Sequence, residues 1–146
     1  MEIKITKLNE KCRIPSRAHY NDAGMDCYAM EDVTLPAMSY YLDGKVTTHP
    51  VMIPLGFNIE VPDGYMAVIK PRSSFNVKGI YTGIGTCDSG YRGEYKAVLM
   101  NLTGKDIEIK AGDRICQIVI EPVVIAHLTE DLGDQRNSGG FGSSGK

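Results

Sequence analysis

The sequence lacks a long apolar run, an excess of one charge and clustered cysteines. No stretch approaches the roughly 18 apolar residues of a membrane span, or the apolar region of a signal peptide. Sixteen Lys and Arg against eighteen Asp and Glu leave a net charge of −2, so charge alone does not attract a nucleic acid backbone. We expect a cytoplasmic protein with no membrane or nucleic acid partner.

The four cysteines show no metal-binding or redox spacing. None forms a C-x-x-C pair or belongs to a Cys/His cluster, and the three histidines are isolated. We expect the thiols to be small buried hydrophobic groups in a reducing compartment rather than zinc ligands or disulfides. The cysteines are Cys12, Cys27, Cys87 and Cys116.

Length and glycine content favour one strand-rich domain. A chain of 146 residues buries roughly 70% of its unfolded surface on folding and needs neither a disulfide nor a metal for stability. Sixteen glycines indicate many tight turns. Short strand patterns recur at residues 57–61, 65–69, 107–109 and 114–120. Because no helical stripe and no repeat is found, we expect a sandwich, jelly roll or barrel with one or two helical turns.

The composition changes at the C-terminus. Residues 134–146 are Gly, Ser and Asn with one aromatic side chain, Phe141, and composition alone predicts a mobile terminus. The glycines match G-x-G-x-x-G and G-x-x-x-x-G-K, but both phosphate-binding patterns need a strand before and a helix after. No Ser or Thr follows Lys146, so we reject both matches.

Two internal segments have residue types suited to chemistry. PRSSFNVKG, from Pro71 to Gly79, predicts a short helix with outward N–H groups and serines, which is either an anion site or a capped turn without a ligand. GTCDSGYRGE, from Gly85 to Glu94, contains the turn sequence Asp-Ser-Gly. Asp88 in this turn either takes part in chemistry or only braces a hairpin.

Five segments in order resemble the five motifs of the trimeric deoxyuridine triphosphatases (dUTPases), over nearly the whole chain. The segments are DAGMDCYA (22–29), PRSSFNVKG (71–79), GTCDSGYRGE (85–94), GDRICQIV (112–119) and RNSGGFGSSG (136–145). The resemblance implies an all-β, jelly-roll-like β barrel with one short helix, assembled as a homotrimer. It implies a barrel domain at residues 1–133 and a mobile C-terminal arm at residues 134–146 that closes over the active site.

The resemblance also implies an activity. The family hydrolyses dUTP to dUMP and pyrophosphate, which keeps uracil out of DNA and supplies dUMP for thymidylate synthesis. Asp88 matches the base that orients the water attacking the α-phosphorus. Tyr91 matches the ring that packs on deoxyribose and excludes a 2′-hydroxyl. The matched positions of the hairpin that reads uracil are Thr82, Gly85, Thr86, Cys87 and Lys96.

Further positions match contacts to the phosphates and the metal. The phosphate contacts would be Arg72, Ser73, Ser74 and Gln117. The arm positions that match substrate contacts are Arg136, Phe141, Gly142, Ser143 and Ser144. Of these, Phe141 would stack on uracil, while the arginine and the serines would meet the γ-phosphate. Asp26 matches the position that helps hold, through water, a Mg²⁺ ion bridging the triphosphate. The resemblance implies that hairpin and arm of one site come from different chains.

Some positions depart from the family pattern. Asn137 follows the arm's arginine where glycine is common, and Thr82 stands where many members have Asn. Three of the cysteines replace common aliphatic or Ala positions, which a core tolerates. Residues 37–50 are several residues longer than usual, which predicts an elaborated surface loop.

Two other functions are weighed against dUTP hydrolysis. dCTP deaminases share the fold and a PRSS-like motif, but they place a glutamate base five residues after the glycine at position 93, where this chain has Val98. Valine cannot transfer protons. A regulatory protein that binds a nucleotide in the same site and switches a protein partner is the other alternative. The full set of catalytic matches, Asp88 above all, argues against regulation as the sole function.

Overall fold

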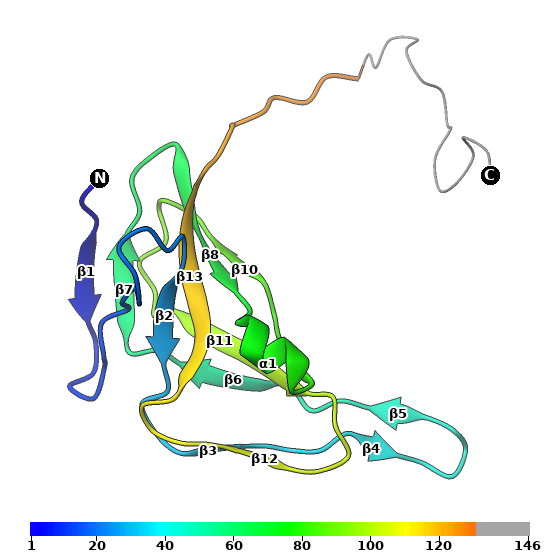
Figure 1. Cartoon of the computed structure of the whole chain (residues 1–146). Helices are drawn as coiled ribbons and strands as arrows, with labels where there is room; N and C mark the ends of the chain where they lie inside the picture. The colour runs from blue at the N-terminus through cyan, green and yellow to red at the C-terminus, as the bar shows by residue number, and fades with distance from the viewer. Residues whose placement is uncertain (131–146) are drawn as a thin grey trace.

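The structure, a computed structural model, describes residues 1–130. Within that range there are thirteen strands and one short helix, and every strand pair is antiparallel. The strands curl around one core into an open, jelly-roll-like barrel (Figure 1), so the all-β prediction is confirmed. The strands are β1 (Lys4–Lys7), β2 (Met25–Tyr28), β3 (Val33–Leu35), β4 (Ser39–Tyr40), β5 (Val46–Thr47), β6 (Val51–Pro54), β7 (Phe57–Glu60), β8 (Tyr65–Lys70), β9 (Ile80–Thr82), β10 (Gly85–Cys87), β11 (Lys96–Asn101), β12 (Ile107–Ile109) and β13 (Arg114–Pro122), and the helix is α1 (Ser73–Val77).

Two sheets position most of the residues singled out in the sequence. The first has the order β10-β8-β13-β2 and the second β6-β11-β9. β13 pairs with β8 on one side and with β2 on the other, and Gln117 lies opposite both Lys70 and Asp26. Because β8 leads almost directly into α1, the first sheet brings the segments DAGMDCYA, PRSSFNVKG and GDRICQIV side by side.

Alternating side chains fill the core. In β7, Phe57 and Ile59 are buried while Asn58 and Glu60 project from the opposite face, as a period of two requires. The Phe57 ring stacks on the buried ring of Tyr95 with 5.6 Å between centroids. Burying one large apolar side chain contributes about 1.5–3 kcal/mol. This contact therefore ties β7 firmly to the chain that follows the GTCDSGYRGE turn.

The cysteine prediction is confirmed for three of the four side chains. Cys12, Cys27 and Cys116 are buried and Cys87 is half-buried, and all four are free thiols. The hydrogen-bonding contact with the Cys116 thiol, and then burial, raise the pKa of the Cys27 thiol.

Two local expectations need correction. The helix α1 follows Arg72, and no side chain caps its first turn: Ser73 and Ser74 are its first two residues. The GTC segment is also not one arm of a simple hairpin with β11. β11 pairs with β9 instead. The last contact between the two is the hydrogen bond from the Gly83 N–H to the Val98 carbonyl, at 2.8 Å, after which the chain that follows β9 turns away from β11. β10 then pairs with the edge of β8.

The ends and the insertion complete the fold. The longer segment at residues 37–50 forms the β4–β5 hairpin, which projects from the barrel with Tyr40 and Val46 exposed (Figure 1). After β13 the chain runs away from the barrel as far as residue 130 (Figure 1). The predicted arm at 134–146 and its boundary at 133 lie outside the described residues. In the described part, no helix has the length and apolarity needed to cross a membrane.

Candidate active site

A pocket of about 350 Å³ opens where β10 and β11 diverge. Thr86 and Cys87 line it from β10, and Lys96 and Val98 line it from β11. β10 is the edge strand of its sheet, and the first residues of β11 pair with β6 alone. Within residues 1–130, backbone N–H and C=O groups at this divergence therefore lack strand partners and are available to a ligand. The remaining lining residues are Met52, Asp88, Tyr91, Glu94 and Tyr95.

A turn at residues 88–91, here called the Asp88 turn, presents a carboxylate to this pocket. The chain reverses as the Tyr91 N–H donates to the Asp88 carbonyl at 3.0 Å. The Asp88 side chain is exposed and lines the pocket. No ion pair or side-chain hydrogen bond within residues 1–130 uses its carboxylate. A free carboxylate in this position can accept hydrogen bonds from water or from a ligand hydroxyl.

Two contacts within the protein fix the Tyr91 ring. Its hydroxyl donates to the Glu94 carbonyl at 3.0 Å, and its ring lies edge-on to Tyr95 with 5.6 Å between centroids. Gly93 permits this position, because a Cβ there would lie 2.6 Å from Cζ of Tyr91. The ring thus forms a rigid wall of the pocket rather than a side chain that must be ordered on binding.

The inner end of the pocket is poorly solvated. Tyr95 is 1% exposed and its hydroxyl oxygen has no hydrogen-bond partner within residues 1–130. Burial raises the pKa of the Tyr95 hydroxyl far above its usual range and also raises the pKa of the Cys87 thiol. Both groups are therefore neutral at physiological pH, and this end of the pocket suits an uncharged ligand group.

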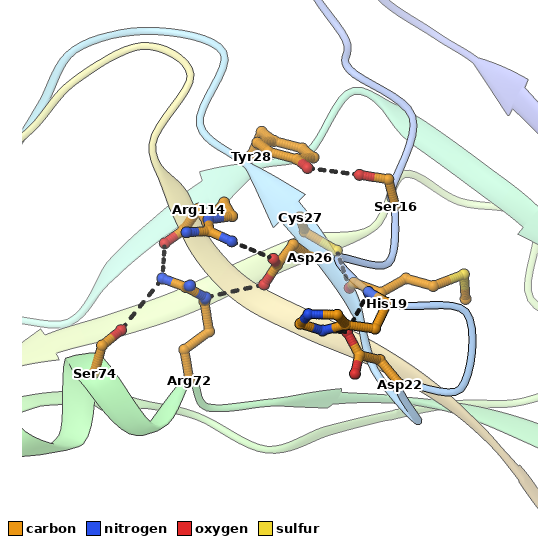
Figure 2. A network of polar contacts seen from close by, with 10 residues as sticks. Ser16, His19, Asp22, Asp26, Cys27, Tyr28, Arg72, Ser74 and Arg114 are labelled. Carbon is orange, nitrogen blue, oxygen red and sulfur yellow. Dashed lines mark hydrogen bonds and ion pairs between the residues drawn. The ribbon is translucent and has the colours of Figure 1, made fainter.

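A second group of polar side chains lies at the α1 end of the first sheet (Figure 2). Arg72 Nε donates to Asp26 Oδ1 at 2.9 Å, and Arg114 Nη1 donates to Asp26 Oδ2 at 3.1 Å. Arg72 Nη1 also donates to the Arg114 carbonyl at 3.0 Å and to Ser74 Oγ at 3.3 Å. We call these four residues the Asp26 network. Two guanidinium groups against one carboxylate leave one excess positive charge, which favours an anion.

Gln117 joins the Asp26 network to the segment before α1. Its side-chain amide donates to the Pro71 carbonyl at 2.8 Å. The glycine of the DAG sequence makes room for it, since a Cβ at Gly24 would lie 2.8 Å from Cδ of Gln117. The structure therefore assembles Asp26, Arg72, Ser74 and Gln117, which the sequence placed in three separate motifs.

The pocket and the Asp26 network are far apart within one chain. Cys87 lies opposite Ala67 in β8, and Arg72 follows five residues later in the sequence. At about 3.3 Å per residue, this separates the Asp88 turn from Arg72 by roughly 15 Å along the strand. One protomer thus brings its predicted site residues together as two groups rather than one.

Three sets of predicted site residues fall outside these two groups. Thr82 is fully buried in β9, its hydroxyl has no partner within residues 1–130, and it does not line the pocket. Gly85 starts β10 beside the pocket, and Ser73 is exposed at the first position of α1. The arm residues lie outside the described range. They are Arg136, Phe141, Gly142, Ser143 and Ser144.

The sequence alone did not single out four residues of these groups, which are Met52, Glu94, Tyr95 and Arg114. Arg114 stands inside GDRICQIV, and Glu94 and Tyr95 directly follow the Asp88 turn. The contacts of three of them are with residues distant in sequence. Arg114 donates to Asp26, and Glu94 Oε1 accepts from the Gly56 N–H at 3.0 Å. Tyr95 stacks on Phe57. A large aromatic immediately after a turn motif was the one available signal for Tyr95.

The donor set near Asp26 fits magnesium only as an ion carried by phosphates. Both oxygens of Asp26 accept hydrogen bonds from arginines. Within the described residues no three His, Cys, Asp or Glu side chains are grouped to hold a metal. Mg²⁺ commonly keeps several waters and binds through one or two carboxylates plus substrate phosphates. Asp26 can take part in such a shell through water.

Comparisons with known proteins place the chain in a family. The dUTPase family model matches residues 10–145. The deoxyuridine 5'-triphosphate nucleotidohydrolase of Yarrowia lipolytica is 38% identical over 151 residues, 99% of this chain and 90% of that protein.

Two solved structures have the same fold. A mutant dUTPase of Staphylococcus bacteriophage 80alpha with dUpNHpp superposes with a TM-score of 0.83 at 23% identity, covering 99% of this chain and 98% of that one. A mutant dUTPase of phage phi11 of S. aureus, described with a structural Mg(II) ion, gives 0.79 at 21% identity over 91% and 98% of the two chains. With a family model matched from residue 10 to residue 145 and a full-length relative at 38% identity, the chain belongs to the dUTPase family.

Proposed function

We propose that this protein is a dUTP diphosphatase, which hydrolyses dUTP to dUMP and pyrophosphate by in-line attack of water on the α-phosphorus. The observation that carries the proposal is the exposed Asp88 carboxylate, which has no partner in the described residues and lies beside a pocket whose inner end suits an uncharged group. Family membership and the name of the Yarrowia lipolytica relative support it. In metabolism this reaction keeps uracil out of DNA and provides dUMP for thymidylate synthesis.

The pocket accounts for recognition of a deoxyuridine. Uracil has an alternating edge of acceptor, donor and acceptor, which backbone groups of β10 and β11 can match at Gly85, Thr86, Cys87 and Lys96. The fixed Tyr91 ring lies where it can pack on the sugar and leave no space for a 2′-hydroxyl. A side-chain contact from Thr82 is not part of the proposal, because Thr82 is buried away from the pocket.

Asp88 is assigned to the attacking water. An ionised carboxylate accepts a hydrogen bond from that water, aligns it with the α-phosphorus and takes its proton as the bond to phosphorus forms and the bond to the pyrophosphate leaving group breaks. A positioned base contributes about 10² to 10⁴ in rate. The larger share of the acceleration must come from aligning the reactants and stabilising the phosphate charge.

The Asp26 network and its neighbours are assigned to the triphosphate. Arg72, Ser73, Ser74 and Gln117 supply donors, and the excess positive charge of the network offsets part of the roughly four negative charges of a triphosphate. Mg²⁺ bound by the triphosphate would neutralise further charge, with Asp26 contacting its waters. The phage phi11 dUTPase is described with a structural Mg(II) ion, which shows that a protein of this fold holds magnesium.

We further propose that each active site is shared between chains of a homotrimer. The roughly 15 Å that separate the Asp88 turn from Arg72 along β8 make it difficult for one protomer to bind both ends of a triphosphate. A neighbouring protomer's network facing the pocket removes this difficulty. The arm at residues 134–146 would close the site, with Phe141 over uracil, and Arg136, Gly142, Ser143 and Ser144 at the phosphates.

Val98 argues against the deaminase alternative. The position that holds the deaminase glutamate is a valine, and this valine lines the pocket beside Thr86, so that position supplies no group that can transfer a proton. A regulatory role on the same site remains an alternative that no observation favours here. A cytoplasmic location is part of the proposal, supported by four free thiols.

The test is a nucleotide panel. The protein is incubated with Mg²⁺ and each deoxyribo- and ribonucleoside triphosphate in turn, and pyrophosphate and ammonia are measured. The proposal predicts pyrophosphate from dUTP alone and no ammonia from dCTP. Ammonia from dCTP, or equal pyrophosphate release from UTP and dUTP, would contradict it. Repeating the dUTP assay with a chelator and then with excess Mg²⁺ tests the metal requirement.

A further inference from the structure

Arg92 lies behind the Asp88 turn rather than in the pocket. It is not among the residues that line the β10–β11 pocket, and instead it lines a hollow on the other side of the turn with Glu60, Ser89 and Gly90. A guanidinium in this place has no direct access to a nucleotide in the pocket. Its contacts with the protein therefore define what it does.

The guanidinium of Arg92 holds two carbonyls of the turn at once. Arg92 Nη1 donates to the Ser89 carbonyl at 2.7 Å and to the Tyr91 carbonyl at 3.0 Å. Arg92 Nη2 lies 3.7 Å from Glu60 Oε1. Charge-assisted bonds of this kind are about twice as strong as neutral ones, and the planar fork fixes their direction. Because Arg92 and Glu60 are both about half exposed, their ion pair contributes little, and the two carbonyl bonds are the main contacts of the guanidinium with the turn.

A second contact joins the same turn to the same strand. Asn58 Nδ2 donates to the Arg92 carbonyl at 2.9 Å. Asn58 and Glu60 are two residues apart in β7 and project from one face, while Phe57 and Ile59 on the other face are buried. The Asp88 turn is thus fastened to the outer face of a strand whose inner face belongs to the core.

The front of the turn is held separately. The Tyr91 hydroxyl donates to the Glu94 carbonyl, and the Glu94 side chain accepts from the Gly56 N–H at the start of β7. Asp88 and Tyr91 are joined by the backbone hydrogen bond within the turn. The contacts behind the turn therefore act on the backbones of Asp88 and Tyr91 together.

We propose that Arg92, held by Asn58 and Glu60, is a positioning residue that sets the Asp88 turn for both water activation and selection of deoxyribose. The inference rests on the roles proposed above for Asp88 and Tyr91. A residue that only stabilised the fold would lower activity toward all nucleotides alike. A residue that positions Tyr91 alters the ratio of kcat/KM for dUTP over UTP as well as kcat for dUTP.

The experiment compares four variants with the wild type. Arg92→Ala removes both carbonyl contacts, and Asn58→Ala removes the contact with the Arg92 carbonyl while leaving the guanidinium in place. Arg92→Lys keeps the charge near Glu60 but cannot reproduce the fork. Lys4→Ala is the control, because Lys4 Nζ is the other cation near Glu60, at 3.6 Å from Oε2, and does not contact the turn. kcat and KM are measured for dUTP and UTP, with melting curves to confirm folding.

Arg92→Ala is expected to lower kcat for dUTP and to narrow the dUTP/UTP ratio, each about tenfold, as the loss of charge-assisted contacts implies. Asn58→Ala should change both quantities in the same direction by less, Arg92→Lys should recover only part of the loss, and Lys4→Ala should match the wild type. If the folded Arg92→Ala and Asn58→Ala proteins keep the wild-type ratio, the inference is wrong even though the wild type hydrolyses dUTP. A wild type that does not prefer dUTP to UTP would instead contradict the proposed function.

Discussion

The β10–β11 pocket and the Asp26 network handle charge in opposite ways. In the pocket the one acidic group of the turn, Asp88, is exposed and unpaired within residues 1–130. In the network the Asp26 carboxylate is 16% exposed, and two arginines occupy both of its oxygens. In the proposed roles, the group that acts on water is accessible, whereas the groups that hold the triphosphate are paired with each other.

This difference has an energetic consequence. Removing one member of a partly buried, hydrogen-bonded charge pair leaves its partner uncompensated, so it costs stability as well as function. Removing an exposed, unpaired carboxylate costs almost no stability. The two halves of the proposed site should therefore separate cleanly when activity and the free energy of unfolding are measured on the same variants.

The largest effect is expected for Asp88→Asn. Asparagine keeps size and hydrogen bonding but cannot take the proton of the water, so kcat for dUTP should fall by about 10² to 10⁴. The free energy of unfolding should stay within about 0.5 kcal/mol of the wild type, and dUTP binding should persist. Turnover at saturating dUTP and urea unfolding curves measure these quantities. A fall in kcat of less than about tenfold would show that Asp88 is not the base.

Asp26→Asn should affect both quantities. One oxygen can still accept from an arginine, but the charge that orders Arg72 and Arg114 is lost, so kcat/KM for dUTP should fall about ten- to a hundredfold. The free energy of unfolding should fall by about 1–3 kcal/mol, the range for hydrogen bonds to charged groups. Glu31→Gln is the matched control, since Glu31 pairs only with the exposed Lys11 in the described structure. An Asp26→Asn protein with wild-type stability would show that the network has no structural role.

The sequence predicted the parts of these two regions better than their arrangement. The alternation at residues 57–61 and the turn at Asp-Ser-Gly are local properties, and both are present in the structure. The pairing of Asp26 with Arg72 and Arg114 depends on the register of three strands, which no local pattern contains. The motif resemblance assigned Asp26 to magnesium and Arg72 to phosphate, and so did not reveal that each contacts the other.

Thr82 and β10 show the same limit. A threonine just before a turn motif gives no sign that its side chain faces the core, because a one-residue shift of register exchanges the two faces of a strand. The departure of β10 from β11 to β8 is also a tertiary choice, decided by which strand edge is free. Thr86, Cys87 and Lys96 of the predicted hairpin line the pocket, whereas Thr82 does not, and β10 pairs with β8 instead of β11.

Tyr91→Ala tests the rigid wall of the pocket. Loss of the ring opens space for a 2′-hydroxyl and removes the surface on which the sugar packs, so kcat/KM for dUTP should fall. Because UTP gains the room that it lacked, the dUTP/UTP ratio should narrow by about tenfold. Tyr91→Phe keeps the ring and loses only the hydroxyl contact with Glu94, so it should retain most of the ratio. An unchanged ratio in Tyr91→Ala would place sugar discrimination elsewhere.

The smallest expected change in activity tests whether the pocket and the arm of one site come from different chains. It is measured as the recovery of dUTP hydrolysis when two inactive variants are refolded together. Asp88→Asn has a defective turn and an intact arm, and a chain truncated before Arg136 has the reverse. Each alone should be nearly inactive. An arm of about a dozen residues can extend some 40 Å and so can reach a neighbouring chain. If sites are shared, equal amounts unfolded and refolded together should rebuild about one quarter of the sites, as random assembly of a cyclic trimer requires.

The mixture should therefore be about fourfold less active than the wild type, far above either parent. If turn and arm came from the same chain, no mixture could restore a site, because every chain has one of the two defects. Asp88→Asn refolded with Tyr91→Ala is the control, since both defects lie in the same turn. Every chain in that mixture has a defective turn, so no site can be rebuilt. The expected activity is therefore no higher than the residual activity of the Tyr91→Ala chains. Size-exclusion chromatography with differently tagged chains verifies that mixed trimers form. Mixed trimers as inactive as their parents would contradict a shared site. The substrate would then have to bridge the roughly 15 Å between the Asp88 turn and Arg72 within one protomer.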